Sequence, residues 1–214
     1  MRWLSLLAVG LVAAGCTGVD GRHYTFRTPA EIDTTRLRLD GYYVTARPWR
    51  YSQWSADEQR VVHESGMYLQ PLVLWRDGTA ALSHLSWSLT DEEIAAGRDP
   101  LLMADSVVVA ISPEREPYGP TAWGAFRLDG DSLQLQVLVS PVGLSPMATW
   151  AFSGRVLSDT SFVLNDLYVG GRRDTRWGTG TRDNPSVFVF RPFAPLPPRD
   201  NWTDTHPKLQ PDTR

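Results

Sequence analysis

The feature of this 214-residue sequence that most constrains its fold is a period of two in its apolar residues. It is clearest over 132–140 (SLQLQVLVS), where Leu and Val alternate with polar residues. Such alternation is typical of a half-buried antiparallel strand. Asp129-Gly130-Asp131 joins this segment to 123–128 (WGAFRL), and Asp-Gly between two β-rich segments is a strong hairpin signal. The chain therefore has to bury one face of an antiparallel sheet.

Similar segments recur along the chain, mostly joined by short turns. Arg76-Asp77-Gly78 predicts a second hairpin, and Pro71 restricts its first strand to an edge or a bulge. The predicted strands are 39–47, 68–75, 79–87, 106–111, 123–128, 132–140, 148–157, 161–169 and 186–190. About eight strands in this order predict an all-β domain, either an antiparallel sandwich or an up-and-down barrel. A barrel has the advantage that it leaves no free edge.

Two capping boxes predict short helices among the strands. Thr28-Pro29-Ala30-Glu31 combines the box with proline at the first helical position, and predicts a helix from 29 to about 36. Thr90-Asp91-Glu92-Glu93 predicts a second short helix, and Gly97 is its expected stop.

The first sixteen residues predict export from the cytoplasm. Residues 3–12 are apolar, but too few to cross a bilayer as a permanent helix. Ala13-Ala14-Gly15-Cys16 resembles the lipobox of bacterial lipoproteins, although Ala13 stands where that family more often has Leu. The resemblance implies cleavage after residue 15, acylation of Cys16 and, from Thr17, transport to the outer membrane. An ordinary signal peptide is the alternative, but it leaves unexplained why the only cysteine stands at the cleavage point.

Composition then divides the chain into four parts. These are a signal peptide (1–15), a lipidated tether (16–27), the barrel domain (28–193) and a Pro-rich tail (194–214) predicted to be extended or disordered. A net charge of −3 gives no basis for binding nucleic acid. A single cysteine excludes an intrachain disulfide framework and a Cys-rich zinc site.

The predicted strand order resembles that of lipocalins and related calycin-type barrels. In lipocalins the first strand carries Gly-x-Trp, and an arginine after the last strand packs over that tryptophan. Here Tyr43 in 40–43 (DGYY) takes the tryptophan position, and Arg191 is the counterpart of the arginine. The second lipocalin motif, Thr-Asp-Tyr, is absent, and 165–168 (NDLY) is only loosely similar. Residues 123–126 (WGAF) also resemble a hairpin found in a group of lipoproteins of unassigned function. The resemblance implies an eight-stranded barrel that is either filled by side chains or holds one small ligand.

Aromatic residues in the strands are the candidates for lining such a cavity. Large rings offer apolar surface, and an indole N–H can orient a guest. The alternative is ordinary core packing, because strands are enriched in aromatic residues. His84 shares a predicted strand face with Leu82 and Ser86, where it would be either a ligand contact or a satisfied core histidine. The candidate ligand-binding residues are Trp87, Trp123, Trp150 and His84.

The segment 170–183 is longer than a hairpin requires and is rich in arginine. Arginine beside tryptophan could dock a phosphate, a carboxylate or a glycan, and the alternative is a solvated loop. The candidate partner-binding residues here are Arg172, Arg173, Arg176, Trp177 and Arg182.

The sequence predicts no catalytic residues, no metal site and no cofactor. The four histidines (His23, His63, His84 and His206) show no ligand spacing. Ser83 and His84 are adjacent on a predicted strand and therefore point to opposite faces, so they cannot act as nucleophile and base.

The sequence therefore predicts a lipoprotein anchored to the outer membrane by Cys16, whose barrel binds a small, partly apolar ligand in the envelope. The alternative is a structural or assembly lipoprotein with a filled barrel that contacts other envelope proteins. An enzyme ranks third, since no catalytic motif is visible.

Overall fold

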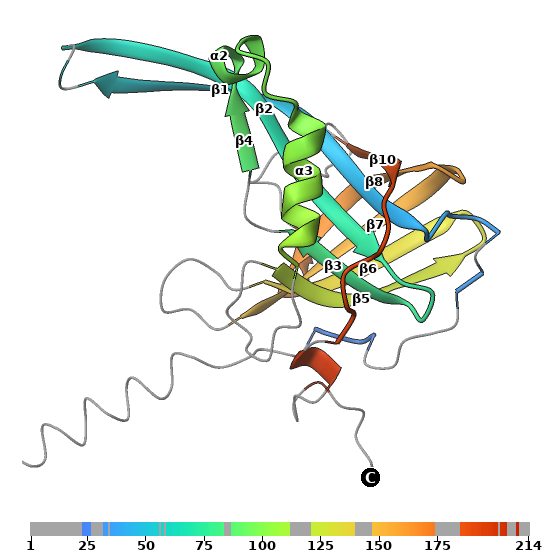
Figure 1. Ribbon diagram of the computed structural model, residues 1–214. Coiled ribbons are helices and arrows are strands. Elements are labelled where there is room, and N and C mark those ends of the chain that lie inside the picture. The colour runs from blue at the N-terminus through green and yellow to red at the C-terminus, as the bar shows by residue number, and fades with distance from the viewer. Residues whose placement is uncertain are drawn as a thin grey trace, which may run out of the picture.

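The chain folds into a closed barrel of eight antiparallel strands (Figure 1). The computed structural model describes residues 23–26, 32–33, 35–55, 57, 59–83, 87–111, 121–139, 147–173, 185–200, 202–204 and 209. The barrel strands are β1 (Gly41–Ser55), β2 (Arg60–Leu74), β3 (Thr79–Ser83), β5 (Thr121–Asp129), β6 (Ser132–Val139), β7 (Ala148–Ser158), β8 (Ser161–Val169) and β10 (Ser186–Pro192). Each pairs with the next in this order, and β10 pairs with β1, so the predicted up-and-down barrel is confirmed.

Five further elements lie outside this ring. The short strands β4 (Trp87–Thr90) and β9 (Arg172–Arg173) pair with β2 and β8 respectively. The helices α2 (Asp91–Ala95) and α3 (Pro100–Val109) come between β4 and β5, and a 3₁₀ turn, η1 (Trp202–Asp204), follows β10. The predicted capping box is confirmed: Thr90 accepts from the Glu93 amide at 3.1 Å, and the Glu93 carboxylate accepts from the Thr90 amide at 3.0 Å.

Inward-facing side chains form the main hydrophobic cluster of the barrel. The pairing registers place alternate residues of every strand inside, as in the row Tyr43, Leu72, Leu82 and Ala122. The ring of Phe162 stacks on Phe188 with centroids 5.1 Å apart and contacts Tyr43 at 4.8 Å. All three rings are buried, so aromatic side chains fill this part of the interior.

One end of the barrel, the tight-turn end, carries the short turns between β2 and β3, β5 and β6, and β7 and β8. The segment 32–40 lies across it. The Arg38 amide donates to the Asp159 carbonyl at 2.9 Å, and the Tyr43 hydroxyl donates to that carbonyl at 3.0 Å. Three side chains of the segment join the inner cluster: Ile32, Leu37 and Leu39. A helix was predicted over 29–36, but residues 32, 33, 35 and 36 are not helical, and the rest lie outside the described residues.

A second hydrophobic cluster covers the outer face of the wall. Helix α3 lies over it (Figure 1), and Trp75 stacks on Trp123 with centroids 5.6 Å apart and planes at 22°. Tyr24 from the predicted tether and Leu209 from the predicted tail are both buried in this cluster. These parts of the terminal segments therefore pack onto the barrel and do not stand apart from it.

The predicted strand at 106–111 was wrong, because most of it belongs to α3. Asp99 caps the helix by accepting from the Leu101 amide at 2.8 Å, and Pro100 occupies the first turn. The helix buries Ala104, Val107 and Val108. Its start signals, together with this buried face, outweigh the strand preference of the three consecutive valines.

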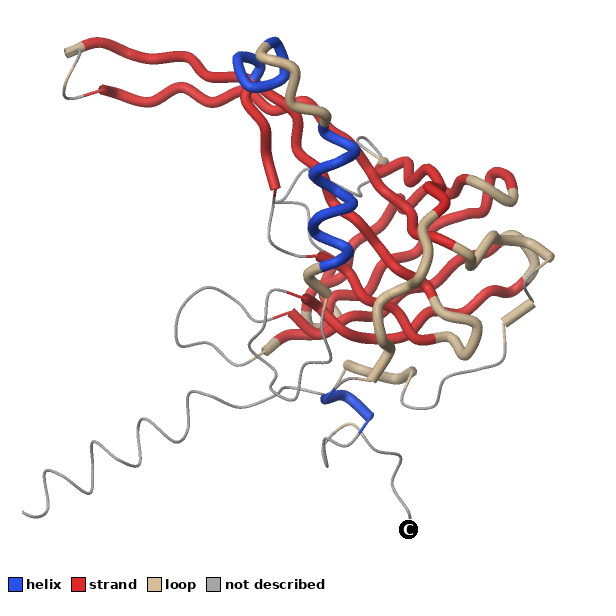
Figure 2. The backbone as a smooth tube through the Cα atoms, viewed as in Figure 1, coloured by secondary structure: helices blue, strands red, loops and turns tan. Residues whose placement is uncertain are grey.

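The hairpin of β1 and β2 extends well beyond the barrel wall, and we call residues 45–55 and 60–71 the arm. Figures 1 and 2 show it projecting from the barrel. Strand β1 pairs with β10 over 41–44, and beyond that point its only partner among the described strands is β2. Pro71 lies between the residues of β2 that pair with β4 (66–69) and with β3 (72–74), where none of the described strands requires an amide donor. The described residues include no helix long and apolar enough to cross a membrane.

Candidate functional site

The predicted ligand-binding residues do not line one common space. Trp150 faces the barrel interior, where it packs edge-on to Phe152 with centroids 6.3 Å apart. Trp123 lies on the outer face and is fully buried in the second cluster. Trp87 begins β4, but its side chain lies outside the described residues, as does His84. Of this set, only Trp150 is placed toward the interior.

The arginine-rich segment is described only at its start. Arg172 and Arg173 form the exposed strand β9, and Arg173 makes an ion pair with Asp166. The other three candidates lie outside the described residues, as does the predicted lipidation site: Arg176, Trp177, Arg182 and Cys16.

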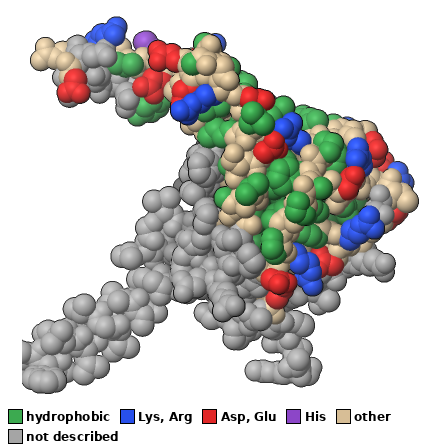
Figure 3. Space-filling view, viewed as in Figure 1, with side chains coloured by type: hydrophobic (Ala, Val, Ile, Leu, Met, Phe, Trp, Pro, Cys, Tyr) green, Lys and Arg blue, Asp and Glu red, His purple; other side chains and the backbone are tan. Residues whose placement is uncertain are grey.

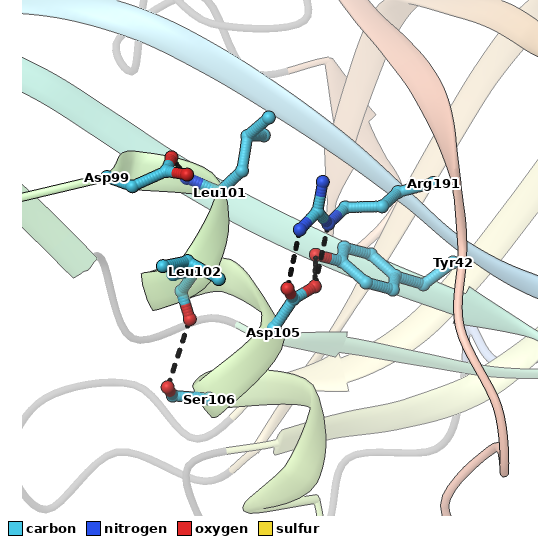
Figure 4. Close-up of polar contacts among 7 residues, drawn as sticks. All are labelled: Tyr42, Asp99, Leu101, Leu102, Asp105, Ser106 and Arg191. Carbon is cyan, nitrogen blue, oxygen red and sulfur yellow. Dashed lines mark hydrogen bonds and ion pairs between the residues drawn. The ribbon is translucent and has the colours of Figure 1, made fainter.

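Arg191 does not pack over Tyr43, and that expectation was wrong. Its register partner is Tyr42, so it lies on the outer face, whereas Tyr43 points inward. Two nitrogens of Arg191 donate to the Asp105 carboxylate of α3, Nε at 2.7 Å and Nη2 at 2.6 Å, and the Tyr42 hydroxyl donates to it at 2.6 Å (Figure 4). We call these three residues the clasp, because they join α3 to the two strands that close the barrel.

The chemistry of the clasp is structural. The hydrogen bonds from Arg191 lower the pKa of Asp105, and burial is the main cause that raises the pKa of the Tyr42 phenol. Both groups are therefore held away from proton transfer near neutral pH. Among the described residues no group of three His, Cys, Asp or Glu side chains lies close enough to hold a metal ion.

The lipocalin resemblance placed Arg191 over the aromatic side chain of the first strand. Arg38 lies near that position instead. Its guanidinium lies 4.4 Å from the centroid of the Phe190 ring, which in turn contacts Tyr43 at 5.4 Å. A cation over an edge-to-face pair of rings therefore does lie at the tight-turn end, but it comes from the segment that precedes β1.

Near the opposite end of the barrel, which we call the loop end, two inward-facing rings are only partly buried. Phe126, Phe162 and Phe188 face inward and are completely screened from water. Trp150 and Phe152 also face inward, but they remain partly exposed. Apolar inner surface near β7 is therefore not fully covered.

The inner face of the wall continues onto the arm, and three side chains lie together there. Arg47 of β1 is directly opposite Tyr68 of β2, and Trp49 follows two residues later on the same face, opposite Gly66. Residues opposite each other have Cβ atoms about 5 Å apart, and diagonal neighbours are about 7–8 Å apart. We call Arg47, Trp49 and Tyr68 the arm-base cluster.

Every polar group of the arm-base cluster lacks a hydrogen-bond acceptor among the described residues. The Nε1–H of Trp49 is buried and unpaired. Arg47 is half-buried, and desolvation lowers the pKa of its guanidinium. Sequence reasoning missed the cluster because the strand was predicted to end at Arg47. The available signal was the alternation of Arg47, Trp49 and Tyr51 beyond that end.

Comparison with known proteins found no match: no family model, no curated protein and no solved structure is significantly similar to this chain.

Proposed function

We propose that this protein is a bacterial lipoprotein, anchored to the outer membrane through Cys16, whose barrel binds a small, partly apolar ligand at its loop end. The anchoring part rests on the apolar 3–12 segment and on the only cysteine following Ala13-Ala14-Gly15. Several acyl chains on one residue give stable membrane attachment, whereas a single chain gives only marginal binding.

The observation that supports the binding part is the partial exposure of two inward-facing rings near the loop end. Trp150 and Phe152 remain partly exposed, whereas the inward-facing rings of Phe126, Phe162 and Phe188 are buried. Partly exposed apolar surface inside a barrel, bordered by a few polar groups, is typical of a small-molecule site.

Anchoring also limits where the barrel can lie. Seven residues lie between Cys16 and Tyr24, which is buried against the barrel wall. A fully extended chain spans at most about 3.5 Å per residue, so Tyr24 would lie within about 30 Å of the membrane surface. The domain would then work at the membrane and not far from it in the periplasm.

Anchoring is tested by the change Cys16→Ser in the full-length chain. The wild-type protein should fractionate with outer membranes and carry the mass of a diacylglycerol and an N-acyl chain. The variant should lose the lipid mass and move to the soluble fraction. Continued tight membrane association of the variant would overturn the lipoprotein assignment.

Ligand binding is tested by native mass spectrometry of the full-length protein in a neutral detergent. We expect an added mass beyond that of the lipidated chain, lost on denaturation and reduced in Trp150→Ala. Trp75→Phe, on the outer face, is the matched control and should keep the added mass. A wild-type protein without added mass would contradict the binding proposal.

A structural role is the second candidate, and one observation favours it. Large apolar side chains are exposed on α3 and β10, and Figure 3 shows hydrophobic side chains on the viewed face. Such side chains are typical of a protein contact surface when they form a patch. The exposed residues are Leu101, Leu102, Val109, Val187 and Val189. Absence of a ligand mass, with a discrete product from a photo-crosslinker at position 102 in cells, would favour this role.

A further inference from the structure

We propose that the arm-base cluster binds the acidic head, a carboxylate or a phosphate, of an amphiphilic ligand whose apolar part lies against the loop end of the barrel. This inference rests on the proposed function and names the chemical class of the ligand. It starts from the three neighbouring side chains Arg47, Trp49 and Tyr68, which lie on one face of the arm.

The cluster offers donors and lacks acceptors for them. Arginine presents five N–H groups and accepts no hydrogen bond, and the tryptophan indole also only donates. The Arg47 side chain makes no ion pair or hydrogen bond with the described residues. The acidic residue on the same face of the arm, Glu64, is opposite Tyr51, two rows beyond Arg47, and is exposed.

Unpaired donors that are shielded from water cost desolvation free energy, and for this reason they indicate a ligand. A half-buried guanidinium loses hydration, and this desolvation is the first cause of the lowered pKa of Arg47. The Nε1–H of Trp49 is out of contact with water and has no acceptor. Unsatisfied buried donors are uncommon in proteins, and an anion that accepts from both groups would satisfy them.

The position of the cluster determines what is attached to the anion. Thr45 and Gln70 form the row between the cluster and the barrel interior, and Thr45 is buried. The inner face therefore continues from the arm into the barrel without a break in register. A ligand with its acidic head at Arg47 would place its remaining atoms toward the apolar inner wall, where Trp150 is partly exposed. An amphiphile, with an acidic head and an apolar tail, matches this order of a polar surface followed by an apolar one.

The test uses full-length protein in neutral-detergent micelles and four probes: hexanoate, hexyl phosphate, hexanol and inorganic phosphate. Binding is measured by isothermal titration calorimetry, with each probe titrated into empty micelles as a blank. We expect the two acidic amphiphiles to bind at least about tenfold more tightly than hexanol, since a charged hydrogen-bonded pair is strong. Weaker binding of inorganic phosphate would show that the apolar chain contributes, whereas phosphate as tight as hexyl phosphate would overturn the amphiphile class.

Two variants separate this inference from the proposed function. Arg47→Gln should reduce the preference for acid over alcohol about tenfold, and Trp49→Phe should weaken acid binding several-fold while the ring is kept. Arg50→Gln is the matched control, because Arg50 is on the same strand but the opposite face, and it should change nothing. Near-ultraviolet circular dichroism confirms that each variant is folded.

Each outcome is decisive. Equal affinity for acids and hexanol, or an unchanged acid preference in Arg47→Gln, would overturn the acidic head while leaving ligand binding by the barrel intact. Binding of no probe would overturn the inference, whereas the proposed function would still be judged by the added mass and its loss in Trp150→Ala. Loss of acid preference in Arg50→Gln as well would indicate general attraction to the arm and would also overturn a specific site.

Discussion

The clasp between α3 and the barrel should contribute substantially to stability, and Asp105→Ala tests this. The change removes the acceptor of three hydrogen bonds, from Tyr42 at 2.6 Å and from Arg191 at 2.7 and 2.6 Å. It leaves a guanidinium and a phenol without their partner. These three bonds join α3 to β1 and β10, which form the closing pair of the barrel.

The expected loss follows from how deeply the pair is buried. Removing one partner of a fully buried ion pair costs about 3–5 kcal/mol, whereas an exposed pair is worth about 0.2–1 kcal/mol. The Arg191 and Asp105 side chains are 28% and 22% exposed, which places this pair between the two limits. We expect Asp105→Ala to lower the free energy of unfolding by about 2–3 kcal/mol, and Tyr42→Phe by about 1 kcal/mol.

The assay is urea unfolding of the full-length protein in neutral-detergent micelles, followed by tryptophan fluorescence. Asp40→Ala is the matched control, because Asp40 makes the same two-bond contact with Arg38 but their side chains are 60% and 41% exposed. Its loss should be clearly smaller than that of Asp105→Ala, because water screens this exposed pair. Equal losses in Asp105→Ala and Asp40→Ala, at unchanged denaturant dependence, would refute the argument from burial.

Three further outcomes can be checked on the same protein. Arg191 lowers the pKa of Asp105, so the Asp105 carboxylate stabilises the folded state fully above its unfolded pKa of about 3.9. This stabilisation is lost as the pH falls through the lower pKa of the folded state. The urea unfolding curves of wild type and Asp105→Ala should therefore converge at acid pH. Gly124→Ala would place a Cβ 1.9 Å from the Gln136 carbonyl oxygen, and thermal unfolding should show a loss of about 3 kcal/mol or more. Thr90→Ala removes the cap of α2, and amide exchange there should become faster by the equivalent of about 1 kcal/mol.

The parts of the fold that could be predicted are those specified by a few neighbouring residues. The hairpin of β5 and β6 is specified by alternation on both sides of Asp129-Gly130-Asp131, and its observed limits differ from the prediction by at most two residues. A two-residue side-chain period and a turn signal need no knowledge of distant residues. The same holds for the capping box of Thr90, which lies entirely within four consecutive residues.

Helix α3 has a local start signal in the sequence, but a competing strand signal led to the wrong prediction. Asp99-Pro100 carries the start pattern that also led to the prediction at Thr28-Pro29, but the valines at 107–109 indicated a strand. Burial decides the conformation. Val107 and Val108 are buried on one face of the helix, whereas Val109 is 70% exposed. That burial depends on where the barrel wall lies, and no short segment of the sequence specifies this position.

The arm-base cluster was missed for a related reason, and the reason explains why the site can exist. Pro48 suggests the end of a strand, since proline cannot donate to a sheet ladder. Beyond residue 44, β1 pairs on one side only with any strand of the described part of the chain, so a missing amide on the other side breaks no ladder bond there. The strand therefore continues through Pro48, and Trp49 lies on the same face as Arg47. Had a third strand paired with β1 at this level, proline would have been excluded and Arg47 would lie within a continuous sheet. The one-sided arm is thus what both permits Pro48 and leaves the donors of Arg47 and Trp49 together beside the loop end of the barrel.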